Sequence, residues 1–352
     1  MTSHIEARGA WLENTWYVAA RSDELGDAPL GRTICGHKMV FFRGGEGKVA
    51  ALEDFCPHRG APLSLGFLKD GGLTCGYHGL SLDCRGKPQG MSGQDVSRLP
   101  GAKAYPCVER HGFIWVWPGD ASRADEARLP RLHWAEDRGW AYGGGLYHIR
   151  CDYRLMIDNL MDLTHETYVH ATSIGQKEID ETPVETVLEG GEVITRRFMR
   201  DVRAPPFWRA ALAGAGLPED AQIDRWQICR FSLPSHVMIE VGVALAGHGG
   251  YEAEHAKKAS SIVVDFITPE TETSHWYFWG MARNFAASDA TLTETIRAGQ
   301  GKIFSEDLAM LEQQQDNLTR NPGRRLVTLN IDAGGAQSRA MIERALKAEA
   351  TT

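Results

Sequence analysis

The sequence predicts an α+β protein of two domains, an all-β module over residues 1–118 followed by an α+β domain over residues 119–352. Three observations predict this organisation. Short apolar runs between glycine-rich turns fill the first third of the chain, and long helical periods are nearly absent there. Longer strand and helix patterns follow. With 352 residues, the chain is long enough for two domains with separate cores.

In the first module, each expected strand is an apolar run that ends at turn residues. The run at 38–42 (Lys-Met-Val-Phe-Phe) is soon followed by a Gly-Gly-Glu-Gly turn. The run at 113–117 (Phe-Ile-Trp-Val-Trp) ends at a Pro-Gly-Asp sequence, and proline cannot continue a strand ladder. Two further short strands are expected at 33–35 and 49–53.

The second domain follows a polar connection at 119–135 and contains longer elements. Leu155, Asn159, Asp162 and Leu163 recur at steps of three and four residues, which predicts a helix over 154–169. Four strand-like runs and two more helical patterns come later. The strands are expected at 226–231, 237–244, 261–268 and 276–282, and the helices at about 292–318 and from about 337.

Composition excludes several classes of protein. The net charge is −8 and no basic block is present, which argues against nucleic acid as a partner. No window approaches the roughly 18 apolar residues that a spanning helix needs, and the N-terminus has no signal-peptide core. We therefore expect a cytoplasmic protein without a membrane partner. Seven scattered cysteines do not form a disulfide framework, and five of them are expected to be small buried side chains: Cys35, Cys84, Cys107, Cys151 and Cys229.

A cluster of cysteine and histidine in the first module predicts a metal site. Cys56 and His58 share one short loop, and Cys75 and His78 share another after a 16-residue gap. Structural zinc and a Rieske [2Fe–2S] cluster both accept two thiolates and two imidazoles. Zinc fingers usually pair like with like, whereas each loop here holds one of each. The spacing therefore favours the Rieske cluster over zinc.

A second cluster lies in the predicted helix. His165 and His170 are five residues apart, so on a regular helix they would be displaced by about 140°. Both can bind one metal if the helix is widened there, as at a π-bulge, or if it ends there. Two histidines and one carboxylate form the facial triad of non-haem Fe(II) oxygenases. Asp162 lies one turn before His165, and we expect its carboxylate to accept a hydrogen bond from that imidazole.

The carboxylate ligand is expected on the late helix instead. Asp307 shares a helix face with Ile303, Met310 and Leu311, so it should point inward. Glu306 shares its face with Lys302 and should point to solvent. A buried carboxylate is unfavourable unless it is paired or bound to a metal. Asp307 is therefore the predicted third ligand.

Taken together, the two motifs resemble those of the Rieske non-haem iron aromatic-ring oxygenases. Nearly the whole chain is similar, within that family, to oxygenase subunits that demethylate methoxylated aromatic acids, through residues 14–19, 53–66, 151–180 and 260–285. The resemblance implies an N-terminal all-β Rieske [2Fe–2S] domain and a helix-grip-like α+β catalytic domain with an antiparallel sheet. The motifs are Cys56-X-His58-X₁₆-Cys75-X₂-His78 and Asn159-X₂-Asp162-X₂-His165-X₄-His170.

The resemblance also implies a role for each residue. Cys56 and Cys75 would bind one iron of the [2Fe–2S] cluster, and His58 and His78 the other. A mononuclear Fe(II) would be bound by His165, His170 and Asp307. Asp162 would bridge the two kinds of centre across subunits of a homotrimer by contacting His165 and the neighbour's His78, with Asn159 beside the open side of the iron.

The implied reaction is the O₂- and NADH-dependent demethylation of vanillate to protocatechuate and formaldehyde. Electrons would come from a separate flavin and iron–sulfur reductase, because the chain has no Gly-X-Gly-X-X-Gly fingerprint in a strand–helix setting. Syringate, veratrate or dicamba is the alternative type of substrate, and a Rieske electron carrier and a zinc protein remain as alternative classes. Five polar residues on the later strands are candidates for the substrate carboxylate, although most should be sheet-surface charges: Arg225, Gln227, Arg230, Glu240 and Asp265.

Overall fold

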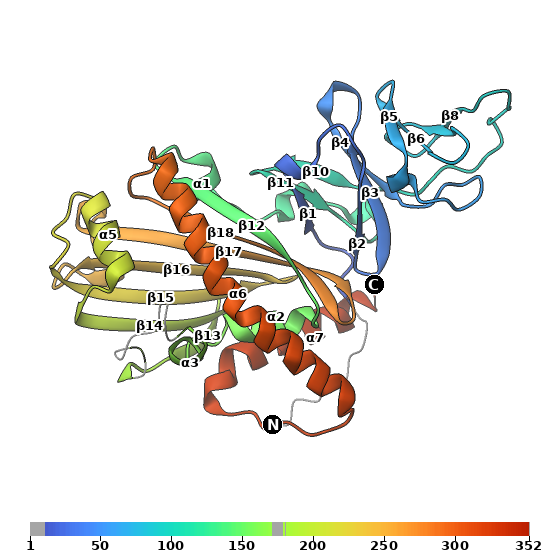
Figure 1. Ribbon diagram of the computed structural model, residues 1–352. Coiled ribbons are helices and arrows are strands. Elements are labelled where there is room, and N and C mark those ends of the chain that lie inside the picture. The colour runs from blue at the N-terminus through green and yellow to red at the C-terminus, as the bar shows by residue number, and fades with distance from the viewer. Residues whose placement is uncertain (1–10, 171–178, 180, 352) are drawn as a thin grey trace. The chain divides into compact units, whose positions relative to one another are not determined.

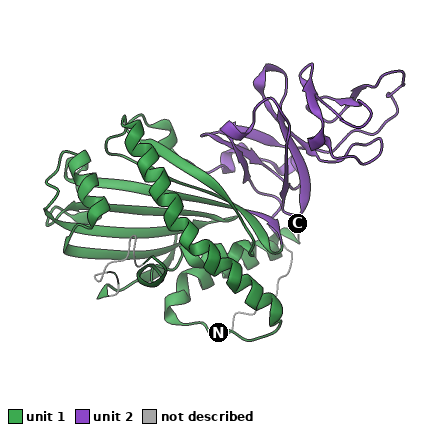
Figure 2. Ribbon diagram, in the orientation of Figure 1, with its two compact units in different colours: residues 1–10, 132–267, 272–352 green, residues 11–131, 268–271 purple. Residues whose placement is uncertain are grey.

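The structure is a computed structural model that describes residues 11–170, 179 and 181–351. It divides into two compact units (Figure 2). The N-terminal unit comprises Trp11–Arg131 with the short segment Thr268–Thr271, and the C-terminal unit comprises Leu132–Ile267 and the chain from Glu272 onward. The domain boundary at residue 118 stays a prediction.

The N-terminal unit is built from antiparallel strands and short turns, as predicted. Its strands form three sheets, with orders β1-β11-β10, β2-β3-β4-β9 and β5-β6-β7-β8. The strands are β1 (Tyr17–Arg21), β2 (Leu30–Ile34), β3 (His37–Arg43), β4 (Val49–Glu53), β5 (Phe67–Lys69), β6 (Gly72–Thr74), β7 (Ser81–Leu82), β8 (Pro88–Gly90), β9 (Ala104–Tyr105), β10 (Cys107–Arg110) and β11 (Phe113–Val116).

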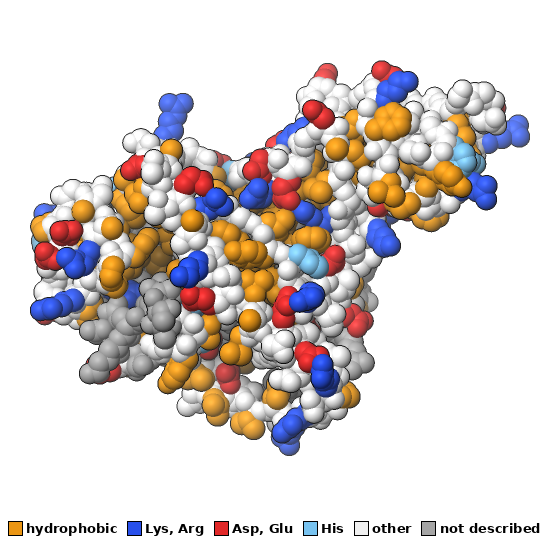
Figure 3. Space-filling view, viewed as in Figure 1, with side chains coloured by type: hydrophobic (Ala, Val, Ile, Leu, Met, Phe, Trp, Pro, Cys, Tyr) orange, Lys and Arg blue, Asp and Glu red, His pale blue; other side chains and the backbone are white. Residues whose placement is uncertain are grey.

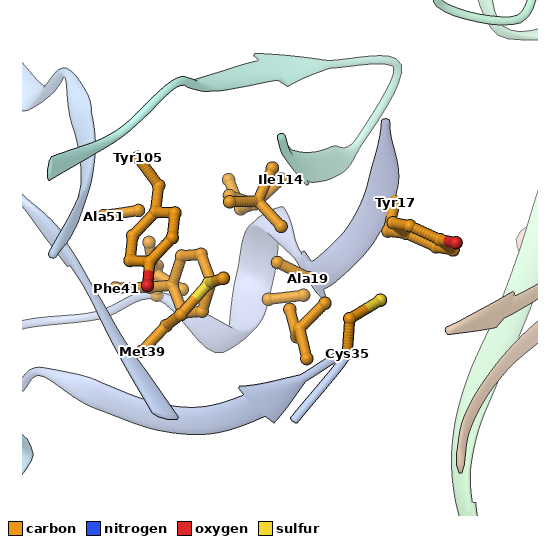
Figure 4. Close-up of a cluster of buried hydrophobic side chains, with 12 residues drawn as sticks. Tyr17, Ala19, Cys35, Met39, Phe41, Ala51, Tyr105 and Ile114 are labelled. Atoms are coloured by element: carbon orange, nitrogen blue, oxygen red, sulfur yellow. The ribbon is translucent and has the colours of Figure 1, made fainter. Parts of the chain in front are cut away.

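Strand β3 is central because both of its faces are buried. Met39 and Phe41 point into one core, where Tyr17 and Ile114 also pack (Figure 4). The alternate residues of β3 point into a second core that includes Cys56 and Cys75. This explains the continuous apolar run at 39–42, which is typical of a strand covered on both faces.

The C-terminal unit contains one seven-stranded antiparallel sheet, which confirms the sheet type implied by the resemblance. The strand order is β12-β18-β17-β16-β15-β14-β13, and β12 pairs with β18, and each strand from β13 to β16 with the next one, in antiparallel register. The strands are β12 (Ala141–Ile149), β13 (Glu185–Glu189), β14 (Glu192–Arg203), β15 (Gln222–Ser232), β16 (His236–Leu245), β17 (Lys258–Thr271) and β18 (Ser274–Arg283).

Helix α6 (Ala290–Arg320) crosses one face of this sheet (Figure 1). It packs closely because Gly301 carries no side chain where the ring of Trp279 approaches, and Tyr147 donates a hydrogen bond to the Gly301 carbonyl at 2.9 Å. Phe304, one turn later, contacts the same tryptophan ring edge to face. The other described α-helices are α1 (His133–Glu136), α2 (Tyr153–Leu160), α3 (Glu166–Val169), α5 (Pro206–Gly214) and α7 (Ala333–Glu349).

Helix α7 holds α2 in place. Arg339 forms an ion pair with Asp158, with one Nε···Oδ1 distance of 2.8 Å. Gly335 lies where an added Cβ would be 2.7 Å from an oxygen of the same aspartate. Since Asn159 follows Asp158, this packing fixes the helix that carries a predicted site residue.

In the C-terminal unit, the strands predicted over 226–282 and the helix predicted at about 292–318 lie close to the observed elements. The helix predicted over 154–169 is interrupted, because α2 ends at Leu160 and α3 begins at Glu166. Strands β12, β13 and β14 and helix α5 were not predicted. No helix among the described residues is long and apolar enough to cross a bilayer.

Replacing a central side chain tests the N-terminal core. Phe41 is fully buried, so Phe41→Ala should leave a cavity and lower the free energy of unfolding of the N-terminal unit by about 3–5 kcal/mol. Urea unfolding followed by tryptophan fluorescence measures this change. Phe67→Ala is the matched control because that ring is 51% exposed, and it should change stability by less than about 1 kcal/mol. Equal losses in the two variants would contradict the assignment of the core.

Candidate metal centres

Two loops of the N-terminal unit have the same backbone design. The Cys56 amide donates to the Ala61 carbonyl, and the Gly60 amide donates back to the Cys56 carbonyl, both at 2.8 Å. The second loop repeats this pattern from Cys75 to Leu80. Both loops turn at a glycine with positive φ, +69° at Gly60 and +75° at Gly79, which other residues adopt with strain.

The loops bring like residues together. Cys56 and Cys75 are each 2% exposed. Burial raises the pKa of the Cys56 thiol, and the hydrogen bond and charge of Cys75 raise it further, whereas backbone N–H groups of His58 and Arg59 lower it. His58 and His78 are exposed, and their rings meet edge to face with centroids 4.8 Å apart. The site thus has a buried thiol pair and an exposed imidazole pair.

This arrangement fits a cluster of two metals better than a single zinc ion. Four ligands around one zinc would all lie within about 4 Å of one another, given metal–ligand distances of 2.0–2.3 Å. Within the described ranges, only one group of three or more His, Cys, Asp or Glu residues has ligand atoms that all lie within 4.8 Å of one another, and that group does not include Cys56, His58, Cys75 or His78. Two separate pairs are what a [2Fe–2S] cluster with mixed ligands requires.

The group that does converge lies in the C-terminal unit. His165, His170 and Asp307 have ligand atoms within 4.8 Å of one another, so they could hold one metal ion. The Asp307 carboxylate is 3.7 Å from Nε2 of His165 and 3.3 Å from Nε2 of His170. The two histidines stand at the N-cap and C-cap of the one-turn helix α3. The helix ends there, so the five-residue spacing needs no π-bulge.

Each histidine is oriented by a hydrogen bond from its other ring nitrogen. His165 Nδ1 lies 2.8 Å from the backbone carbonyl of Asp162. His170 Nδ1 lies 2.7 Å from Oε2 of Glu306. A carbonyl or carboxylate oxygen can only accept, so Nδ1 carries the proton in both rings, and Nε2 presents its lone pair to the metal position.

The carboxylate of this group is also held in place by a hydrogen bond. Asn159 Nδ2 donates to Oδ1 of Asp307 at 3.0 Å, and the Asp307 residue as a whole is 2% exposed. Burial opposes the charged form of His170, but the hydrogen bonds and charges of Asp307 and then Glu306 outweigh burial and raise its pKa. A site of two imidazoles and one carboxylate suits a divalent first-row metal such as Fe(II) and leaves positions for other ligands.

Two sequence predictions about neighbouring acids are wrong. The side chain of Asp162 does not accept from His165, because its Oδ1 accepts from the backbone N–H and the hydroxyl of Thr164 at 2.7 and 2.6 Å. The backbone carbonyl takes its place. Glu306 does not point to solvent, because its carboxylate reaches back to His170. Met310, predicted on the inward face with Asp307, is 58% exposed.

The polar strand residues have varied surroundings. Arg230 pairs with Glu240, and Arg225 is buried. Asp265 is fully buried and accepts a hydrogen bond from Tyr277 at 2.6 Å. Burial raises the pKa of Asp265 to about 8, and the charge of Asp307 adds to this against the opposing hydrogen bond from Tyr277.

Comparisons with known proteins agree with this geometry. Residues 15–106 match the Rieske [2Fe-2S] domain, and residues 149–348 match the vanillate O-demethylase oxygenase C-terminal domain. The chain is 68% identical to a vanillate O-demethylase oxygenase subunit of Pseudomonas sp. strain HR199, over 96% of this chain and 95% of that protein.

Solved structures are similar over the same length. The crystal structure of dicamba monooxygenase bound to 3,6-dichlorosalicylic acid has a TM-score of 0.88 at 32% identity and covers 97% of this chain and 100% of that chain. Dicamba monooxygenase with non-haem iron and dicamba has a TM-score of 0.81 at 32% identity, with coverage of 96% and 98%.

The fold and the two sites define a Rieske-type monooxygenase component that combines a [2Fe–2S] domain with an α+β catalytic domain. This chain belongs to the family whose catalytic domain is that of the vanillate O-demethylase oxygenases. The fold class implied by the resemblance is confirmed.

Removing the charge on Glu306 tests its support of His170. Glu306→Gln keeps an oxygen that can accept from Nδ1 but weakens the bond, so Fe(II) affinity should fall by about tenfold. Titration of the iron-depleted protein with Fe(II) measures the affinity. Glu312→Gln on the same helix is the control, because Glu312 pairs with Arg150 instead and should bind iron as the parent protein does. Unchanged affinity in Glu306→Gln would refute the supporting role.

Proposed function

We propose that this protein is the oxygenase component of a system that demethylates vanillate. The observation that carries the proposal is the 68% identity, over nearly the full length of both chains, to a vanillate O-demethylase oxygenase subunit. In the balanced reaction, vanillate, O₂, NADH and a proton give protocatechuate, formaldehyde, water and NAD⁺. The methoxy carbon is oxidised, and its bond to the phenolic oxygen breaks.

The residues divide between two metal groups. Cys56 and Cys75 would hold one iron of the cluster, and His58 and His78 the other. His165, His170 and Asp307 would hold Fe(II). When bound, these groups supply electron storage and oxygen activation. The fit rests on the thiol and imidazole pairs and on the Nε2 lone pairs that face Asp307.

The remaining residues of the site would hold these ligands in place. Asn159 orients the Asp307 carboxylate through its amide. Asp162 fixes the loop before His165 through Thr164 and its own carbonyl.

The electron donor is proposed to be a separate NADH-dependent flavin and iron–sulfur reductase. Exposed apolar side chains surround the cluster loops and offer a docking surface, and hydrophobic side chains gather near β5 and β6 in Figure 3. They are Phe55, Leu65, Phe67 and Tyr77. The exposed imidazoles of His58 and His78 would let the cluster serve the iron of a neighbouring subunit in a homotrimer. We place the system in the cytoplasm, where NADH is available.

Product analysis tests the substrate. The purified protein with a supplied reductase should release one formaldehyde per NADH from vanillate, and faster from vanillate than from syringate, veratrate or dicamba. Formaldehyde and protocatechuate are measured together. A faster reaction with one of the other acids would reassign the substrate. Iron analysis separates the alternative classes, because an oxygenase holds three irons per chain and an electron carrier holds two.

Asp162→Asn tests the bridging role. The amide oxygen can still accept both hydrogen bonds from Thr164, so the loop should stay in place while the negative charge is lost. Both metal groups should remain, and single-turnover oxidation of the reduced cluster should slow by about tenfold or more. Stopped-flow absorbance measures this rate. Asp316→Asn is the matched control, since the partly exposed Asp316 carboxylate pairs with Arg320 instead. A parent-like rate in Asp162→Asn would remove the bridge from the mechanism.

A further inference from the structure

Three buried polar side chains link the sheet to the segment that carries both histidines. Arg197 on β14 and Gln227 on β15 are paired in register, so their side chains leave the same face of the sheet. Glu166 lies between His165 and His170, in the first turn of α3. Their exposures are 1%, 4% and 6%. None of the three is a ligand in the proposed metal site.

The contacts run from the sheet to this segment at two points. Gln227 Nε2 donates to both carboxylate oxygens of Glu166, at 2.8 and 3.1 Å. Arg197 donates to the backbone carbonyl of Leu163 at 2.5 Å and to Oε1 of Gln227 at 3.4 Å. The Gln227 amide therefore has its oxygen toward the guanidinium and its nitrogen toward the carboxylate, which is the favourable orientation for both charges.

Burial of such charged side chains is energetically unfavourable. Moving a guanidinium or a carboxylate out of water costs several kcal/mol per ion, and well-packed apolar residues of similar volume often give equal or greater stability. Stability alone therefore does not account for the burial of these charged groups. The two groups bound by the sheet, the Leu163 carbonyl and the Glu166 carboxylate, each lie next to a site residue, because Leu163 follows Asp162 and Glu166 follows His165. The contacts therefore act on the position of His165.

We propose that Arg197, Gln227 and Glu166 are positioning residues that set the place of His165 relative to Asp307. This inference rests on the proposed iron site. It gives a role to Gln227, which the sequence predicts as a candidate for the substrate carboxylate, and to Arg197 and Glu166, for which the sequence indicates no role. Arg197 and Gln227 are fixed on the sheet, and their hydrogen bonds hold α3 in a defined position relative to it. The segment that carries His165 is also held by local hydrogen bonds within 162–165. Without the contacts of Arg197, Gln227 and Glu166, we expect this segment to shift relative to Asp307.

Substitutions that keep the volume but change the polarity test this proposal. Gln227→Leu removes all three hydrogen bonds of the Gln227 amide, and Gln227→Glu places a second carboxylate beside Glu166. In both variants, bound Fe(II) should be lost to a chelator about tenfold faster or more, and the ferrous–nitrosyl EPR signal should broaden or split. The EPR signal of the reduced cluster should not change, since its ligands are in the other unit.

A double variant gives a test that does not depend on how well the single variants fold. Glu166→Gln with Gln227→Glu restores one amide and one carboxylate and places the carboxylate nearer Arg197. The rate of iron loss should return to within about threefold of that of the parent protein. Glu240→Gln is the matched control, because Glu240 lies on the neighbouring strand but on the opposite face, where it pairs with Arg230.

The outcomes separate this proposal from the proposed function. Parent-like iron loss and nitrosyl spectra in Gln227→Leu and Gln227→Glu would overturn the positioning role, as would a double variant no better than Gln227→Glu. Faster iron loss in both single variants, together with recovery in the double variant, would support the positioning role. Neither result depends on vanillate turnover, because failure of the parent protein to release formaldehyde from vanillate would affect only the proposed substrate.

Discussion

The C-terminal unit depends on one constraint, which is that a buried carboxylate must have partners. Asp307 is almost fully enclosed, and an isolated carboxylate there would be strongly destabilised. Its oxygens are met by the amide of Asn159 on α2 and lie close to the imidazoles at the two ends of α3. Helices α2 and α3 therefore converge on α6, which lies more than 100 residues later in the chain. The sheet, the packing of α7 on α2 and the close approach at Gly301 all hold this convergence in place.

The N-terminal unit solves a different problem, because its ligands lie on two short loops. Each loop closes on itself through the same pair of backbone hydrogen bonds and turns at a glycine that takes positive φ readily. Local closure fixes each pair of ligands, and the shared core beneath Cys56 and Cys75 fixes one loop against the other. This is why a four-residue motif with fixed spacing carried so much information.

Sequence reasoning succeeded where a signal is local or periodic. Strands β15 to β18 and the long helix α6 follow from apolar runs and helical spacing, and Asp307 was placed inward by its helix face. It failed where the outcome depends on partners distant in sequence. Glu306 turns toward His170, which is 136 positions away, and a solvent-facing helix position gave no sign of it. Strand β12 escaped prediction because its glycines have low strand propensity, and packing against β18 overrides this.

The mononuclear site is asymmetric, and the asymmetry follows from which elements surround it. The side chains of His170 and Asp307 are only 4% and 3% exposed, whereas the side chain of His165 is 20% exposed, and Asp162 is partly exposed beside it. One side of the site is therefore sealed by α6 and the sheet, and the other faces outward through the loop before α3. His165 and Asp162 are thus the more exposed part of this group, and the buried pair of His170 and Asp307 lies behind them. The carbonyl bond to His165 and the anchored carbonyl of Leu163 give this outward side its rigidity, since an exposed loop has no core to supply it.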